Sequence, residues 1–301
     1  PRSQAAGGGQ AGWLVGHGGR IEKTTDGGGS WQVQTSGVTE FLEAVHFWNE
    51  NNGCAVGRFG RILTTIDGGV TWEVRTSGTS QFFYDVEFID ENTIIVVGNR
   101  GTLLKSTDTG ATWSTKPSAT TSLLQDLRFI DNSIGWAIGF DDDGLIVKTT
   151  DGGESWTRMS TGLDGPEDTW LNQIHFLDEM NGWIVGSAGM MMKTTDGGET
   201  WESQAPGTRV ILGTYDFVDD QHGWIGGELG TLLRTTDGET WEEFSIGSSR
   251  QFWAVDFIDT ELGWAAGWDE IYHSIDGGEN WVRQESGCLL YTSDAADDGL
   301  C

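Results

Sequence analysis

The stretch Lys-Thr-Thr-Asp-Gly-Gly-Glu-Thr-Trp at residues 193–201 decides the fold, because it returns along the chain at a nearly constant interval. Its core is a Ser or Thr, one residue, an Asp, a Gly-rich turn, a Ser, Thr or Asn, and a Trp, the motif known as an Asp box. The seven copies have their Asp at Asp26, Asp67, Asp108, Asp151, Asp196, Asp237 and Asp276. Successive Asp residues lie 41, 41, 43, 45, 41 and 39 positions apart. A period of about 40 residues is typical of one four-stranded propeller blade per repeat.

Each repeat carries signals for four strands, which we call A to D. An alternating Val-x-Phe segment such as Val86 to Phe88 predicts strand A, and a Gly-Trp run closed by a Gly, as in 182–186, predicts strand B. Cys54 and Ile95 take the Trp place of strand B in the second and third repeats. Strand C leads into the box, and strand D starts at the box Trp. We therefore expect an all-β, seven-bladed β-propeller with an Asp box in each blade.

The two ends of the chain depart from the repeat. The first repeat has no Val-x-Phe segment before Gly12, so we expect a first blade that is missing its inner strand and treat 1–11 as a truncated N-terminal segment. The propeller domain then covers 12–287. Residues 288–301 resemble the in-frame translation of a sequencing-library adapter, and we exclude this scar from the fold and the function.

The Asp box has a structural explanation. An Asp that enters a tight hairpin accepts backbone N–H groups, and the glycines supply the positive-φ positions. One carboxylate per loop is too few for a calcium site. We therefore assign the seven box Asp residues a structural role, and expect no metal and no cofactor.

Composition and charge limit the function classes. The net charge is −29, or −26 without the three Asp residues of the adapter-like tail, which argues against nucleic acid and anionic membranes as partners. The sequence has no transmembrane stretch, and it begins without Met, so a signal peptide cannot be observed. With the tail set aside, Cys54 is the single Cys, and we interpret it as a buried small hydrophobe and not as a nucleophile.

The coupling of a Gly-Trp-x-x-Gly run to each box, as in 182–186 and 193–201, resembles the photosystem II stability/assembly factor-like (BNR, or Asp-box) propellers. The resemblance covers 12–287. It implies a non-enzymatic scaffold that is extracytoplasmic, whether periplasmic, lumenal or secreted, and that binds another protein, such as a subunit of a membrane complex. We further expect a monomer that does not itself span the membrane.

Enzyme classes that use Asp boxes can be compared with the chain directly. The Arg-Ile-Pro signature of sialidases is absent. A glycosidase needs two opposed carboxylates, and the candidates in strand A are Asp85, Glu87, Asp126, Asp216 and Asp256. We interpret these carboxylates, with His46 and His175, as polar residues that line a solvated channel, and we assign no catalytic residue. An Asp-box glycoside hydrolase and a secreted carbohydrate-binding propeller remain the alternatives.

The candidate binding face is the one that carries the D–A and B–C connections, with the Asp boxes on the opposite face. Two insertions, 140–144 and 162–168, fall on it, and insertions concentrated on one face often mark the binding face. Arginines also map there, accompanied by aromatic residues, and this composition is that of interface hot spots. The partner-binding candidates are Arg20, Arg58, Arg61, Arg100, Arg250, Trp170 and Trp253.

Two further expectations concern charge and sugar binding. The arginines would meet an acidic segment of a partner, while acidic residues of the two insertions polarise the rest of the face; these are Asp141, Asp142, Asp143, Asp164, Glu167 and Asp168. In the carbohydrate alternative, Trp170, Trp253 and Trp268 would stack on sugar rings. The basic residues that precede the boxes are interpreted as structural; these are Lys23, Lys105, Lys148, Lys193 and Arg234.

Overall fold

The computed structural model describes residues 3–6, 11–26, 30–141, 144–162, 169–267 and 270–284. The chain divides into two compact units, Pro1–Ala205 and Pro206–Cys301. The described residues are all-β, as the sequence predicts, and their helices are three-residue 3₁₀ turns. These turns are η1 (His17–Gly19), η2 (Arg58–Gly60), η3 (Asn99–Gly101), η4 (Ser187–Gly189) and η5 (Glu228–Gly230). The adapter-like segment 288–301 lies outside the described residues.

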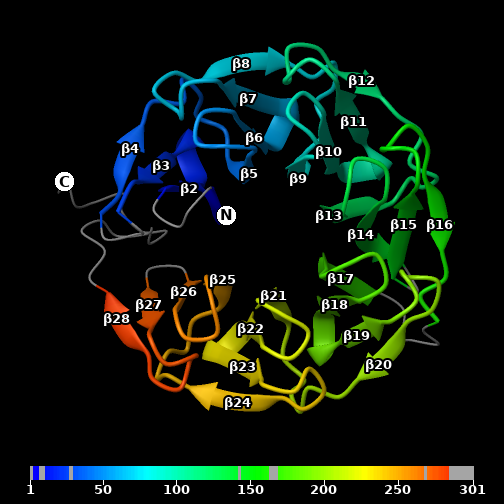
Figure 1. The fold of residues 1–301 in the computed structure, drawn as a ribbon. Helices are drawn as coiled ribbons and strands as arrows, with labels where there is room; N and C mark the ends of the chain where they lie inside the picture. Colours follow the sequence, from blue (N-terminus) through cyan, green and yellow to red (C-terminus); the bar gives the residue numbers. More distant parts are fainter. Residues whose placement is uncertain are drawn as a thin grey trace. The chain divides into compact units, whose positions relative to one another are not determined.

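The first unit is built from antiparallel sheets in which four successive strands follow one another in chain order (Figure 1). The strands of the first three sheets are β1 (Ser3–Ala6), β2 (Ala11–Val15), β3 (Ile21–Thr24), β4 (Gln32–Gln34), β5 (Leu42–Phe47), β6 (Gly53–Gly57), β7 (Arg61–Thr65), β8 (Glu73–Thr76), β9 (Phe83–Phe88), β10 (Ile94–Gly98), β11 (Leu103–Ser106) and β12 (Ser114–Thr115). The remaining strands of this unit are β13 (Leu123–Phe129), β14 (Gly135–Asp141), β15 (Leu145–Thr149), β16 (Thr157–Met159), β17 (Thr169–Phe176), β18 (Gly182–Gly186), β19 (Met191–Thr194) and β20 (Glu202–Gln204).

The expectation of a first repeat without an inner strand is wrong. Strand β1 pairs with β2 in antiparallel register, from Ser3 opposite Leu14 to Ala6 opposite Ala11, and completes a four-stranded sheet. The sequence Ser-Gln-Ala-Ala lacks the Val-x-Phe alternation, but a sheet ladder is made of backbone N–H and C=O groups, which every one of these residues supplies. The first part of segment 1–11 therefore belongs to the first sheet.

Two of the four-stranded groups in the first unit are joined into one eight-stranded sheet. The end of β14 pairs with the start of β17, with Phe140 opposite Trp170 and Asp141 opposite Thr169. Both strands are longer than their counterparts, because each borders one of the two insertions. The insertions that the sequence places on one face thus border strands that meet.

The second unit contains two four-stranded antiparallel sheets with the same chain order. Its strands are β21 (Leu212–Phe217), β22 (Gly223–Gly227), β23 (Thr231–Thr235), β24 (Glu242–Ser245), β25 (Phe252–Phe257), β26 (Gly263–Gly267), β27 (Ile271–Ser274) and β28 (Val282–Gln284).

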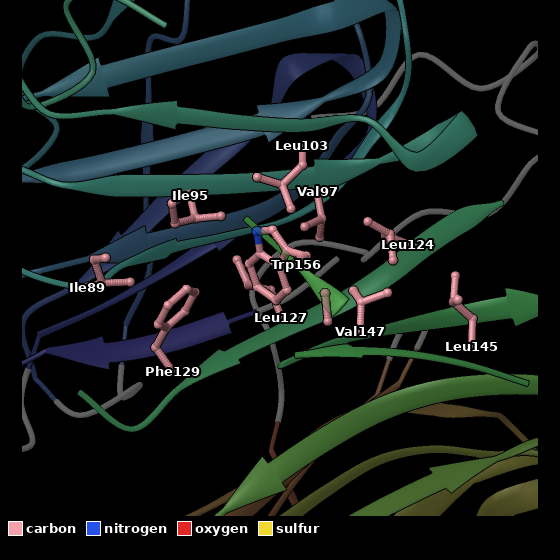
Figure 2. Packing of buried hydrophobic residues seen from close by; sticks show 11 residues of the cluster. Ile89, Ile95, Val97, Leu103, Leu124, Leu127, Phe129, Leu145, Val147 and Trp156 are labelled. Carbon is pink, nitrogen blue, oxygen red and sulfur yellow. The ribbon is translucent and has the colours of Figure 1, made fainter. Parts of the chain in front are cut away.

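The hydrophobic core lies between successive sheets. Figure 2 shows one such layer, in which Ile95 and Leu103 of one sheet pack with Leu127, Val147 and Trp156 of the next. All five of these side chains are buried. Burial of apolar surface of this kind is the main favourable contribution to folding.

The strand B Trp stacks on the strand A Phe of the next four-stranded group. Trp136 is fully buried and stacks on Phe176, with ring centroids 3.7 Å apart and planes 13° from parallel. The box Trp201 meets the same Phe176 edge-on, at 5.9 Å. The Gly of the Gly-Trp pair makes room for this ring, because a Cβ at Gly182 would lie 2.7 Å from Phe176. Cys54 and Ile95 fill the Trp place in their sheets and are fully buried, as predicted.

The basic residue of strand C holds the box turn of the next sheet, which supports its structural interpretation. Lys148 Nζ lies 5.3 Å from the centre of the Trp136 ring and donates to the Gly197 carbonyl at 2.8 Å. Lys105 donates to the Gly152 carbonyl at the same distance. A cation over an aromatic face and a charge-assisted hydrogen bond together link the sheets.

Candidate functional site

The Asp boxes use their polar atoms within their own turns. In the second box, Thr71 donates its N–H to Asp67 Oδ1 at 2.9 Å and its hydroxyl to Oδ2 at 2.7 Å, while Thr65 donates its hydroxyl to Oδ1 at 2.8 Å. Equivalent bonds from Ser155 and Thr149 lower the pKa of Asp151 to about 2. Hydrogen bonds to a carboxylate favour its charged form. The carboxylates of Asp67 and Asp151 thus accept hydrogen bonds within their own turns.

The strand A carboxylates have a different role from the one we expected. Asp85 Oδ2 accepts the N–H of Leu127 at 3.0 Å, Glu87 Oε2 accepts that of Phe129 at 2.9 Å, and Asp126 Oδ2 accepts that of Ile174 at 2.6 Å. Asp85, Glu87 and Asp126 are buried, so the interpretation of an acidic edge in a solvated channel is wrong for them. Strand A is the first strand of its sheet and leaves one edge unpaired, and the carboxylates of the preceding sheet satisfy its amides.

The second unit repeats this arrangement. Thr214 Oγ1 accepts the N–H of Val255 at 3.3 Å, and Asp216 Oδ2 accepts the N–H of Phe257 at 2.7 Å. Asp256 is exposed. Four of the five glycosidase candidates therefore accept a backbone N–H of a neighbouring strand A; these are Asp85, Glu87, Asp126 and Asp216.

Burial has opposite effects on two side chains of this array. His46 Nδ1 accepts the N–H of Phe88 at 3.1 Å, and burial lowers the pKa of His46 to about 3, which keeps its ring neutral. Burial raises the pKa of Glu87 to about 8, although Arg128 Nη1 lies 3.7 Å from its Oε1 and counteracts the effect. Removing either charged form from water is unfavourable.

The B–C turns and the D–A connections lie together, as predicted. Gly60 in η2 donates its N–H to the Gln81 carbonyl at 2.7 Å, and Gly101 in η3 donates to the Ser122 carbonyl at 2.6 Å. The box turn instead meets the A–B connection, since Gly68 donates to the Asn51 carbonyl at 2.9 Å. Each sheet thus has a box end and a B–C/D–A end.

The middle residue of each 3₁₀ turn in the described residues has the left-handed backbone conformation, and one of these five residues is a glycine. The five residues and their φ angles are Gly18 (65°), Phe59 (58°), Arg100 (55°), Ala188 (54°) and Leu229 (57°). A bulky residue at positive φ is uncommon and marks a place where strain is retained. Sequence reasoning missed this feature.

Aromatic and basic side chains of the first three sheets gather at the B–C/D–A end. The Arg58 guanidinium lies 4.7 Å from the Phe41 ring centre and 5.7 Å from that of Phe82. Phe59 meets Phe82 edge-on at 5.0 Å, and His17 meets Phe41 edge-on at 4.2 Å. Arg58, one of the predicted binding residues, is therefore in contact with aromatic side chains at this end.

Most of the predicted arginines carry an acidic partner, which corrects the expectation of a basic cluster. Arg20 pairs with Glu22, and Arg61 pairs with Glu40.

Arg58 Nε lies 2.9 Å from Glu43 Oε1. Arg100 is exposed and makes no ion pair with any described residue. The local positive charge is thus concentrated at Arg100 within this part of the face.

Trp170 stands at the joint between β14 and β17. Its ring stacks on Phe140, with centroids 4.4 Å apart, and 39% of the residue is exposed. Asp141 binds Arg158 Nη1 at 2.6 Å, so it is neutralised locally. The other acidic residues predicted to polarise this face lie outside the described residues; these are Asp142, Asp143, Asp164, Glu167 and Asp168.

The second unit carries the remaining candidates. Arg250 is exposed, and its carbonyl accepts the N–H of Gly230 in η5 at 2.7 Å, which places it at the B–C/D–A end of its sheet. Trp253 in β25 is 37% exposed. Trp268 lies outside the described residues. Across the part of the chain that is described, no three metal-ligating side chains cluster, and no helix has the length and hydropathy to cross a membrane.

Comparison with known proteins identifies relatives of this chain. The family model described as photosynthesis system II assembly factor YCF48 matches residues 31–115, 117–214 and 206–289. No curated protein matches the chain in sequence.

Among solved structures, YCF48 bound to D1 peptide is similar with a TM-score of 0.71 and 19% identity, over 90% of this chain and 87% of that one. YCF48 from Cyanidioschyzon merolae has a TM-score of 0.75 and 17% identity, over 92% and 95% of the two chains. The GH74 xyloglucanase from Xanthomonas campestris has a TM-score of 0.73 and 13% identity, over 92% of this chain but 53% of the enzyme. At these identities the likeness is one of fold.

Proposed function

Because the chain belongs to the family of the photosynthesis system II assembly factor YCF48, we propose that it is a non-enzymatic scaffold that docks a subunit of a membrane complex. The docking surface is the B–C/D–A end of its sheets. Its binding residues are Arg20, Arg58, Arg61, Arg100, Arg250, Trp170 and Trp253. The observation that carries the proposal is the contact between arginine and aromatic side chains at this end in the first three sheets.

A relative supports the kind of partner. YCF48 has been solved bound to D1 peptide. By extension, we propose that the ligand of this chain is a peptide segment of a membrane-complex subunit. An extended segment could cross the described arginine and aromatic side chains, which supply planar hydrogen-bond donors and apolar area with little loss of rotamer freedom.

The seven repeats and the propeller relatives support a seven-bladed propeller for the whole chain, with one Asp box in each blade. A monomer in an extracytoplasmic compartment fits an assembly factor of this family. Both statements are part of the proposal. Mass measurement in solution and localisation of a tagged full-length protein test them.

The absence of hydrolytic activity is also part of the proposal. Asp85, Glu87 and Asp126 are buried and each accepts a backbone N–H of the next sheet. A glycosidase needs two carboxylates that flank a substrate bond. Hydrolysis of β-glucans or aryl sialosides that is lost in Asp126→Asn would contradict the proposal and support the GH74-like alternative.

A carbohydrate-binding propeller is the second candidate, and the exposure of Trp170 and Trp253 favours it. One face of Trp170 is already covered by Phe140, which leaves the other for a sugar ring. Such a ligand would depend on aromatic stacking and little on the arginines.

The deciding experiment compares two variants in capture from membranes of the source organism. Arg58→Glu combined with Arg61→Glu should lose the partner, and 0.5 M salt should weaken wild-type binding in the same way, since exposed charges are screened at about that ionic strength. Arg283→Glu, an exposed arginine on β28, is the matched charge control. Loss of polysaccharide binding in Trp253→Ala, with unchanged polysaccharide binding in the arginine variant, would favour the sugar-binding alternative.

A further inference from the structure

The tips of the B–C turns combine strain with exposure. Phe59 occupies the left-handed position of η2 at φ 58°, where η1 has Gly18 at φ 65°. Glycine takes this conformation without a steric penalty, whereas a side chain with a Cβ does not. Phe59 is also 61% exposed. A strained, exposed aromatic contributes little to folding, so its presence needs another reason.

The tips of η2 and η3 are connected through contacts with Phe82. The Phe59 ring rests edge-on against Phe82, which belongs to the connection between the second and third sheets. The Phe82 carbonyl in turn accepts the N–H of Asn99 at 2.8 Å, and Asn99 precedes Arg100 at the tip of η3. Phe82 therefore fixes the Phe59 tip relative to the Arg100 tip. We call Arg58, Phe59, Phe82 and Arg100 the tip surface.

The charges of the tip surface are unequal. The Arg58 guanidinium lies against Phe41 and Phe82 and is neutralised by Glu43. Arg100 has no acidic partner among the described residues and is exposed. The tip surface thus offers one apolar anchor, Phe59, and one unneutralised cation, Arg100, on adjacent turns.

We propose that Phe59 and Arg100 form a two-point anchor for an extended peptide segment that carries an apolar side chain close to a carboxylate. This inference rests on the docking function proposed above and names the chemistry of the bound segment. The apolar side chain packs against the exposed part of Phe59 over Phe82, and the carboxylate pairs with Arg100. A neutral sugar ring would satisfy Phe59 and leave the cation unpaired, so a peptide with both groups fits better.

The test is a selection of displayed random 12-residue peptides on the intact protein, followed by affinity measurement with the enriched peptides in solution. We expect enrichment of an aromatic residue or Leu within about three positions of Asp or Glu. Phe59→Gly should weaken binding at least tenfold without a fall in melting temperature, because Gly relieves the backbone strain. Phe59→Trp should retain binding. Arg100→Gln should weaken binding and reduce its dependence on salt.

Ala188→Gly is the matched control, since it makes the same backbone change at another tip, at φ 54°, and should leave affinity unchanged. A fall in melting temperature with Phe59→Gly would show a structural role and overturn the proposal. Affinities that do not respond to Phe59→Gly and Arg100→Gln would overturn it too, as would a selection that enriches no peptide. If a D1-derived peptide binds but ignores both substitutions, the docking function stands and the anchor fails. If selected peptides need both residues while no membrane-complex peptide binds, the anchor stands and the docking function fails.

Discussion

The Asp-box turns and the B–C turns both recur along the chain but differ in what their side chains do. In the boxes the repeated residue types are those whose polar atoms are used inside the turn, as for Asp67 and Thr71. In the B–C turns the left-handed backbone repeats, while its middle residue changes from Gly18 to Phe59 and Arg100. Repetition of the residue therefore marks the framework. The residue that varies on a repeated, strained backbone instead lies at the end of the sheets that we propose as the docking surface.

The largest stability effect is expected in the framework that joins the sheets. Trp136→Ala removes a fully buried indole, its stack on Phe176 and the aromatic face below Lys148. We expect a loss of about 3–5 kcal/mol in the free energy of unfolding, measured by urea denaturation. Trp170→Ala at the B–C/D–A end is the control and should cost about 1 kcal/mol or less, because that ring is partly exposed. Equal losses would contradict the division between framework and surface.

A buried strand A carboxylate should give the next largest effect, which appears as a pH dependence of the free energy of unfolding. The pKa of Glu87 is raised from 4.5 to about 8, so the folded state holds a proton that the unfolded state releases. The stability that Glu87 contributes is fully present below pH 4.5 and is lost as the pH rises through 8. Glu87→Gln, whose amide oxygen still accepts the Phe129 N–H, should gain about 3–4 kcal/mol relative to wild type between pH 5 and pH 8. A difference that is flat over this range would show that Glu87 is ionised throughout.

A box carboxylate should matter less and titrate in the opposite direction. Asp151→Ala removes the acceptor of the Ser155 and Thr149 hydrogen bonds and should cost about 1–2 kcal/mol at pH 7. The pKa of Asp151 is lowered to about 2, so its contribution is present above pH 3.8 and is lost as the pH falls towards 2. Melting curves of wild type and variant should therefore converge in acid. A gap that persists at pH 2 would mean that the turn is held by something other than the carboxylate.

The smallest effect is expected at a tip. Ala188→Gly removes the Cβ of a residue whose φ is 54°. We expect the free energy of unfolding to stay unchanged or to rise by up to about 1 kcal/mol. Ala188 has no large side chain to bind a partner, so this variant measures the backbone strain alone. Thermal unfolding beside wild type is sufficient, and a clear loss of stability would show that the tips are not strained.

The sequence predicts the framework well because its signals are repeated side-chain patterns. The Gly-Trp runs, the Val-x-Phe strands and the boxes each identify one element. Strand β1 has no such pattern, and Ser3–Ala6 pairs with β2 through backbone groups that any sequence supplies.

The carboxylates of Asp85 and Asp126 could have been assigned from the sequence. Both occupy the same position in strand A, 41 residues apart, beside a strand edge whose amides need acceptors. The acidic partners of Arg58 and Arg61 could not, because Glu43 and Glu40 approach them only through the pairing of neighbouring strands. The left-handed conformation of Phe59 could not be predicted from the sequence either, because the residue type that signals this conformation is glycine and position 59 is a Phe.

Photo-cross-linking in membranes of the source organism tests the central claim most directly. A photoreactive phenylalanine analogue would replace Phe59 at the B–C/D–A end of the second sheet, and in a matched protein Val70, which is 78% exposed in the box of the same sheet. The account predicts a cross-link to one membrane-complex subunit from position 59 and none from position 70. A cross-link to that subunit from position 70 alone would contradict it and move the docking surface to the Asp-box end.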